Sequence, residues 1–102
     1  MAQVNELGTK VAERELELHR VDGTVEPLIV RIGMPLQVDG DQDYCCPYEI
    51  SSEIKTKLRG VLGIDSLQSL DLVLAAIRAD LATLENKRMG TFKFLGEPGH
   101  GF

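Results

Sequence analysis

The sequence contains no tryptophan and only five other aromatic residues, two tyrosines and three phenylalanines. Its hydrophobic core must therefore be built mainly from aliphatic side chains. Long apolar runs are missing as well, since the longest, residues 72–77, is far shorter than the roughly 20 residues of a membrane-spanning helix. The N-terminal residues also lack the continuous apolar stretch of a signal peptide. We therefore expect a cytoplasmic protein without a membrane partner.

Basic residues are scarce: 11 Lys and Arg stand against 16 Asp and Glu, which gives a formal net charge of −5. A nucleic-acid-binding protein needs a cationic surface to displace the counterions of the phosphates, so we expect no nucleic-acid partner. Cysteine is scarce too. The two cysteines, Cys45 and Cys46, are adjacent and do not form a disulfide framework, which favours a reducing compartment.

What is present fits one domain. A chain of 102 residues with 43% hydrophobic and 26% charged residues is typical of a globular protein with a single core. The pattern places this domain over residues 11–95. Residues 1–10 are predicted to be a loose lead-in, and residues 96–102 a glycine-rich tail.

The first two strands are predicted from alternation. Residues 11–20 alternate between apolar and polar side chains, and residues 25–33 form a second strand after the turn sequence VDGT. A two-residue turn would place the apolar residues of the two strands on opposite faces. We therefore predict a loop one residue longer, which pairs Leu16 with Val30 and Glu15 with Arg31.

Two further strands are predicted before the helix. Residues 43–50 form the third strand, and residues 52–60 form the fourth, with Ile54 and Leu58 facing inward. The basic residues of the fourth strand then face outward. A short helix is the alternative for residues 53–60.

The clearest element is a long helix that starts at Asp65 or Ser66 and ends between Asn86 and Gly90. Asp65 or Ser66 can cap it, and Gln68 completes a capping box. Its apolar stripe alternates steps of three and four: Leu67, Leu70, Leu74, Ile77, Leu81 and Leu84. Residues 91–95 form a last strand. The order β-β-β-(β)-α-β predicts an α+β fold, in which one long helix packs on one face of an antiparallel sheet.

The cysteines lie in the stretch DYCCPYEI, where strand geometry points neighbouring side chains to opposite faces. Cys46 shares its face with both tyrosines and is predicted to be a core residue. Cys45 is an accessible thiol on the other face. Only His19 and His100 could serve as its base, and no pattern brings either near it. We therefore predict no catalytic residue, no metal ligand and no cofactor.

Two rows of charge mark candidate binding residues. The acidic row is either a docking strip for a basic partner or a solvated face that prevents edge-to-edge aggregation. The basic row is expected on the same open face, and together the rows would be self-complementary in a weak homodimer. The rows are Glu13, Glu15 and Glu17, and Lys55, Lys57 and Arg59.

The helix start is a third candidate. Asp65, Ser66 and Gln68 cluster at a helix N-terminus, where backbone N–H groups attract anions. The alternative is that these side chains only cap the helix.

Three stretches, VRIGMP, YCCPYEI and GIDSLQSLDLVLAAIRADL, resemble a family of small stand-alone bacterial proteins of uncharacterised function. The resemblance covers most of residues 11–85, and Ser69 stands where alanine is more usual in that family. It implies a folded unit and a bacterial source, and it supplies no activity. The matching positions are Arg31, Ile32, Gly33, Pro35, Cys46, Pro47, Tyr48, Gly63, Asp65, Ser66, Gln68 and Leu70.

The sequence therefore favours a small non-enzymatic binding or regulatory protein that acts on a protein partner through its open sheet face. The alternative is a small enzyme or ligand-binding domain that uses Cys45 or the helix start at residues 65–68. Neither interpretation identifies a substrate or a partner.

Overall fold

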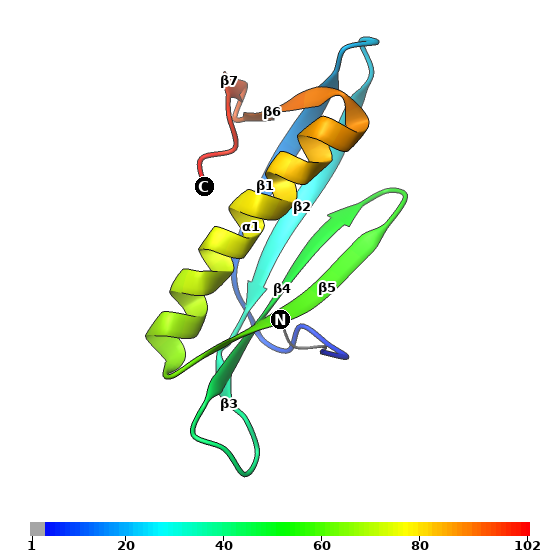
Figure 1. The fold of residues 1–102 in the computed structure, drawn as a ribbon. Helices are drawn as coiled ribbons and strands as arrows, with labels where there is room; N and C mark the ends of the chain where they lie inside the picture. The colour runs from blue at the N-terminus through cyan, green and yellow to red at the C-terminus, as the bar shows by residue number, and fades with distance from the viewer. Residues whose placement is uncertain (1–3) are drawn as a thin grey trace.

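The computed structural model describes residues 4–102, and within this range the chain forms seven strands and one helix. Every strand pair is antiparallel and the helix packs on one face of the sheet (Figure 1), so the predicted α+β fold is confirmed. The elements are β1 (Lys10–Arg20), β2 (Val25–Gly33), β3 (Leu36–Gln37), β4 (Tyr44–Ser52), β5 (Thr56–Gly63), α1 (Ser66–Arg88), β6 (Gly90–Phe94) and β7 (Glu97–Pro98).

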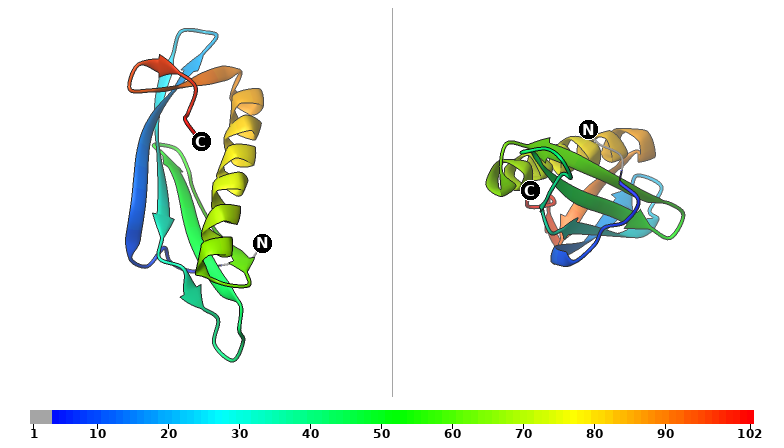
Figure 2. Two further views of the ribbon diagram at one scale, coloured as in Figure 1. Left: turned by 90° about the vertical axis from the view of Figure 1, so that its left-hand side faces the viewer. Right: turned by 90° about the horizontal axis from the view of Figure 1, so that it is seen from below.

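The sheet has the strand order β5-β4-β2-β1-β6-β7, and the short β3 follows β2 along the same edge of β4. Pro47 has no N–H to donate, and it lies between the parts of β4 that pair with β2 and β3. The helix runs along the length of the sheet (Figure 2), which gives an elongated molecule of 49 × 22 × 21 Å.

Strands β1 and β2 form the predicted hairpin in a different register. Leu16 pairs with Leu28 instead of Val30, and Arg31 pairs with Glu13 instead of Glu15. The predicted pairs are therefore wrong by two residues, and the Arg20 N–H donates to the Thr24 carbonyl (2.9 Å), which closes a loop of residues 21–23. Two registers that differ by two residues put the same side chains on the same faces, so alternation does not distinguish them.

Helix α1 begins where the sequence predicted. The Gln68 N–H donates to the Asp65 carboxylate (2.8 Å), and the Ile64 N–H donates to Gln68 Oε1 (2.7 Å). The helix ends at Met89, which adopts the left-handed conformation with φ 50°. Among residues 4–102, no helix combines the length and the apolar character needed to cross a bilayer.

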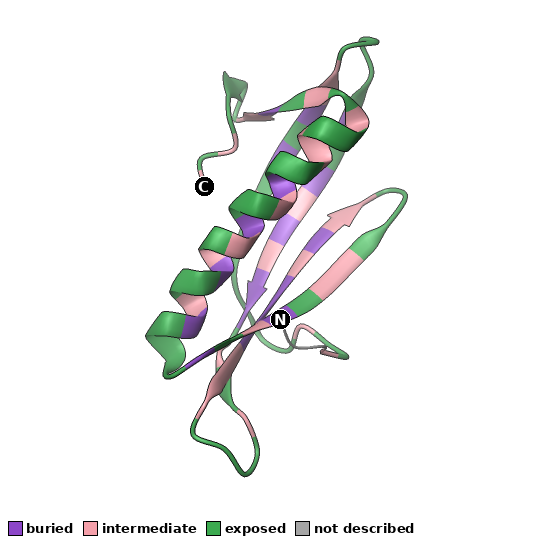
Figure 3. Cartoon of the chain, viewed as in Figure 1, coloured by how far each residue is buried: buried purple, intermediate pink, exposed green. Residues whose placement is uncertain are grey.

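The core lies between α1 and the inner face of the sheet (Figure 3). The helix contributes Val73, Ile77 and Leu81, which are fully buried. Leu67, predicted as the first residue of the apolar stripe, is instead 76% exposed, and the buried Ser69 is the residue of the first helical turn that faces the sheet. The sheet contributes Leu16, Leu18, Leu28, Val30, Ile32, Cys46, Tyr48, Ile50 and Phe92.

The N-terminal segment packs on the outer face of the sheet at Gly33. A Cβ atom at position 33 would lie 2.1 Å from the Leu7 carbonyl oxygen and 2.7 Å from Pro47 Cγ. Only glycine permits this close approach. Leu7 is half-buried, and residues 1–3 of the predicted lead-in lie outside the described range.

The C-terminal tail folds back beside α1, on the side opposite the β4–β5 hairpin (Figure 1). The guanidinium of Arg14 on β1 lies 4.3 Å from the ring centre of Phe94 and 4.8 Å from that of Phe102. Arg14 also donates a hydrogen bond to the His100 carbonyl (3.1 Å). These contacts hold the tail against the sheet.

Candidate functional site: a basic cleft beside the helix

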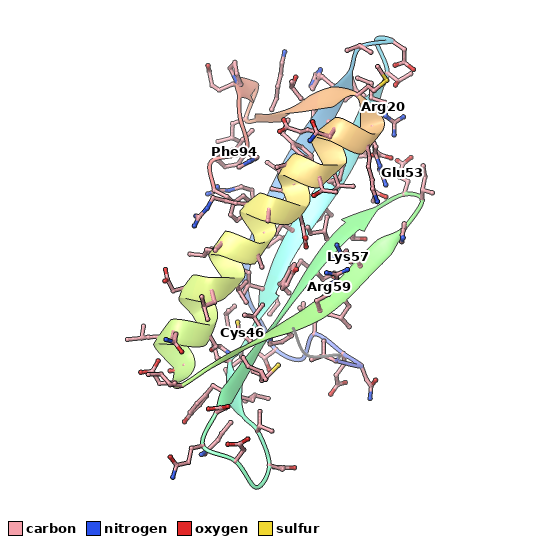
Figure 4. All side chains as sticks on the ribbon, in the orientation of Figure 1. Arg20, Cys46, Glu53, Lys57, Arg59 and Phe94 are labelled. Atoms are coloured by element: carbon pink, nitrogen blue, oxygen red, sulfur yellow. The ribbon has the colours of Figure 1, made fainter. Side chains whose placement is uncertain are left out.

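The basic row of β5 lies on the inner face of the sheet. Lys57 pairs with Ile50, and Arg59 pairs with Tyr48. Directly opposed residues of antiparallel strands share a face, and Ile50 and Tyr48 are both buried under α1. Lys57 and Arg59 therefore face the helix, and Figure 4 shows both side chains between the hairpin and α1.

The predicted orientation of this strand is therefore wrong, although residues 56–63 do form a strand instead of the alternative helix. Leu58 pairs with Glu49 on the outer face, and Ile54 is 77% exposed in the hairpin turn. The acidic and basic rows lie on opposite faces of the sheet. The argument for a homodimer through one self-complementary face does not hold.

A cleft of about 370 Å³ separates the β4–β5 hairpin from the C-terminal half of α1. Its apolar lining comes from β2, β4 and α1, and its polar lining is predominantly basic. The apolar residues are Leu28, Ile50 and Leu84, and the polar residues are Ser52, Lys55, Lys57, Arg59, Asp80, Thr83, Lys87 and Arg88. We call this site the basic cleft.

The basic cleft concentrates positive charge in an acidic protein. It contains five of the eleven Lys and Arg residues and one acid, Asp80, so its lining carries a formal charge of +4 in a chain of −5. Lys55 and Lys87 are exposed on opposite walls, and neither forms an ion pair with any residue from 4 to 102. A cleft lined by one sign of charge focuses the field and raises the local concentration of anions.

A hydrogen-bond network orders the inner wall of the cleft. The Tyr48 hydroxyl donates to Asp80 Oδ2 (2.6 Å), and Lys57 Nζ lies 3.4 Å from Asp80 Oδ1. Burial and the neighbouring carboxylate both raise the pKa of Tyr48, which keeps its hydroxyl protonated. Both oxygens of Asp80 are thus engaged, and Asp80 positions the ammonium group of Lys57 at the cleft.

A second charged group anchors the end of the helix beside the cleft. The buried Glu26 of β2 pairs with Arg20 of β1 (3.1 Å) and with Arg88 of α1. One carboxylate therefore ties the β1–β2 hairpin to the last turn of the helix. The ion pair with Glu26 fixes the position of Arg88, and Arg88 also lines the cleft.

The acidic row is partly matched by its own neighbours. Arg31 donates hydrogen bonds to Glu13 (2.8 Å) and to Glu49 (2.8 Å). The hydrogen bond from Arg31 to Glu13 lowers the pKa of Glu13. Glu17 lies 3.3 Å from His19 Nε2, and Glu15 is exposed. This arrangement favours the interpretation of a solvated face.

The cysteines lie on opposite faces, as strand geometry requires. Cys46 is fully buried, and burial raises its pKa to about 11. Cys45 is half-buried, and burial raises the pKa of its thiol as well, which lowers the fraction of reactive thiolate at neutral pH. Within residues 4–102, no group of three or more His, Cys, Asp or Glu side chains is arranged to hold a metal ion.

The helix start is occupied by its own cap. The Asp65 carboxylate accepts from Gln68, the Gln68 amide oxygen accepts from Ile64, and the Ser69 hydroxyl donates to the Ser66 carbonyl (3.0 Å). These bonds account for the side chains of Asp65 and Gln68, whereas Ser66 takes part through its backbone carbonyl. Capping is sufficient to explain them.

Sequence reasoning identified the β5 side of the cleft but missed its helix side, Asp80, Thr83, Lys87 and Arg88. Lys87 and Arg88 lie in the last turn of α1, where basic residues commonly interact with the helix dipole, so the sequence alone does not indicate a second role for them. The pairing of β4 with β5 is the signal that could have found the site, because a basic residue opposite Tyr48 or Ile50 must face the same way as these core residues.

The fold and the cleft define a small α+β domain with an open, cation-lined groove. Residues 12–102 match the family model described as a domain of unknown function (DUF6968). The chain therefore belongs to this family, which carries no assigned activity. No curated protein and no solved structure matches the chain significantly.

Proposed function

We propose that this protein is a small non-enzymatic bacterial binding protein of the cytoplasm, and that its ligand is anionic and occupies the basic cleft. The observation that carries the proposal is the gathering of five basic side chains around one cleft in a chain of net charge −5. The cleft replaces the open sheet face as the binding surface, because Glu13 in the acidic row there is paired with Lys10 and Arg31 and the row gathers no comparable excess of charge around a cleft.

The composition of the cleft supports binding. Its volume of about 370 Å³ lies within the range of roughly 300–1,000 Å³ that is usual for ligand sites. Leu28, Ile50 and Leu84 provide an apolar surface, and the surrounding cations provide attraction and orientation. Catalysis is disfavoured because Tyr48 is inaccessible and both oxygens of Asp80 are engaged.

The experiment is a titration of the ¹⁵N-labelled protein with tripolyphosphate at low ionic strength, followed by NMR. We expect amide shifts concentrated in residues 55–59 and 83–88, the two walls of the cleft. The double variant Lys55→Glu/Lys87→Glu should weaken binding at least tenfold, because it reverses one charge on each wall. Both residues are exposed and lack ion pairs among residues 4–102, so this variant should fold.

The control for net charge is Lys10→Glu/Lys93→Glu, which changes the net charge equally and removes one exposed ion pair, that of Lys10 with Glu13. These two residues pair with Gly33 and Glu17, so they lie on the outer face, away from the cleft. Affinity close to that of the unmodified protein is expected. Equal weakening by both double variants, or shifts scattered over the whole surface, would show a nonspecific response to net charge and refute the proposal.

A further inference from the structure

The basic cleft has a regular row of cations along one wall. Lys57 and Arg59 are alternate residues of β5, and Lys55 precedes the strand by one residue and also lines the cleft. Alternate positions of an extended strand are about 6.8 Å apart, so the row spans about 13 Å. This period is the same as that of alternate side chains in any extended peptide.

We propose that the ligand of the basic cleft is an acidic protein segment in extended conformation, with acidic side chains at alternate positions facing Lys55, Lys57 and Arg59. This inference rests on the proposed function, because it requires that the cleft binds anions. The segment lies between β5 and α1. Its intervening side chains face the helix at Thr83 and Leu84, so small apolar or hydroxyl side chains fit there.

Charge complementarity favours several acidic groups over one. The lining carries five cations and one acid, and Lys55 and Lys87 are on opposite walls. A single carboxylate neutralises one of these positions, whereas alternate acids along a segment reach the whole row. Because the cations are at an open site, binding should be fast and strongly weakened by salt.

The test compares two labelled peptides of identical composition by fluorescence anisotropy. In one, glutamates alternate with threonines; in the other, all glutamates are consecutive and the threonines follow. We expect the alternating peptide to bind at least fivefold more tightly. Lys55→Glu/Lys87→Glu should weaken that binding at least tenfold, and the outer-face control Lys10→Glu/Lys93→Glu should leave it nearly unchanged.

The outcomes separate this inference from the proposed function. If the two peptides bind equally, or not at all, while tripolyphosphate still shifts the cleft amides, the ligand is a compact anion and the inference is overturned. If neither peptide nor tripolyphosphate binds, the proposed function is refuted as well. Circular dichroism and thermal melting of each variant confirm that a loss of binding is not a loss of fold.

Discussion

The hydrogen bond between Tyr48 and Asp80 should be a large single contribution to stability. Tyr48 is completely buried, and its hydroxyl donates to a carboxylate at 2.6 Å, so Tyr48→Phe leaves that oxygen of Asp80 without its donor. Hydrogen bonds to charged groups contribute about 1.5–3 kcal/mol, and we expect the free energy of unfolding to fall by this amount. The matched control is Tyr44→Phe. Tyr44 is a half-buried residue of the same strand and face, and its hydroxyl bonds to no residue within 4–102.

The assay is urea unfolding of a double-mutant cycle with Tyr48→Phe and Asp80→Ala. Asp80→Ala also removes the partner of Lys57, and the cycle subtracts that effect. We expect a coupling free energy of about 1.5–3 kcal/mol and a change below about 0.5 kcal/mol for Tyr44→Phe. A coupling below 0.5 kcal/mol would refute the assignment of Asp80 to the bond with Tyr48.

Three further predictions concern stability. Burial raises the Cys46 pKa from 9.0 to about 11, so the folded protein holds a proton that the unfolded chain loses. Stability therefore falls as pH rises from 9 to 11, by up to about 3 kcal/mol. Urea unfolding at pH 8 and pH 11 should show a much smaller alkaline loss for Cys46→Ala, and a loss that is reduced less for Cys45→Ala, whose thiol is only half-buried; equal losses in both variants would contradict this cause. Met89→Gly should stabilise the protein by about 1 kcal/mol in thermal unfolding, because it relieves a left-handed residue whose side chain is 66% exposed. Gly63→Ala should cost about 3 kcal/mol or more, because its Cβ would lie 2.4 Å from the Ser69 backbone nitrogen, and a melting temperature unchanged within 2 °C would disprove this packing.

Local patterns predicted the elements whose structure is determined locally. The cap at Asp65 and Gln68 lies within one helical turn, so the start of α1 could be read from a few neighbouring residues. The faces of β1 followed from the alternation of Leu16 and Leu18 with glutamates. The register of the β1–β2 hairpin did not follow, because it depends on the geometry of the loop at residues 21–23.

The cleft was not predicted because it depends on long-range pairing. Leu58 looks like an inward residue in isolation, but its pairing with Glu49 places it on the outer face. The basic residues of β5 remain near solvent on the inner face because α1 does not fill the space beside the hairpin, which becomes the cleft. The tail shows the same limit, since no local pattern places Phe102 against Arg14 on the first strand.

The pairing of β1 with β6 has a consequence for how the chain folds. Leu18 pairs with Phe92, so the first strand obtains its second neighbour only from residues that follow the whole helix. During synthesis from the N-terminus, the free edge of β1 and part of the apolar face of the β1–β2 hairpin remain exposed until β6 has been synthesised. Contacts of such high sequence separation slow folding. We therefore expect sheet closure at β6 to be a late step, and a nascent chain that stops before Gly90 to be the species most prone to aggregation.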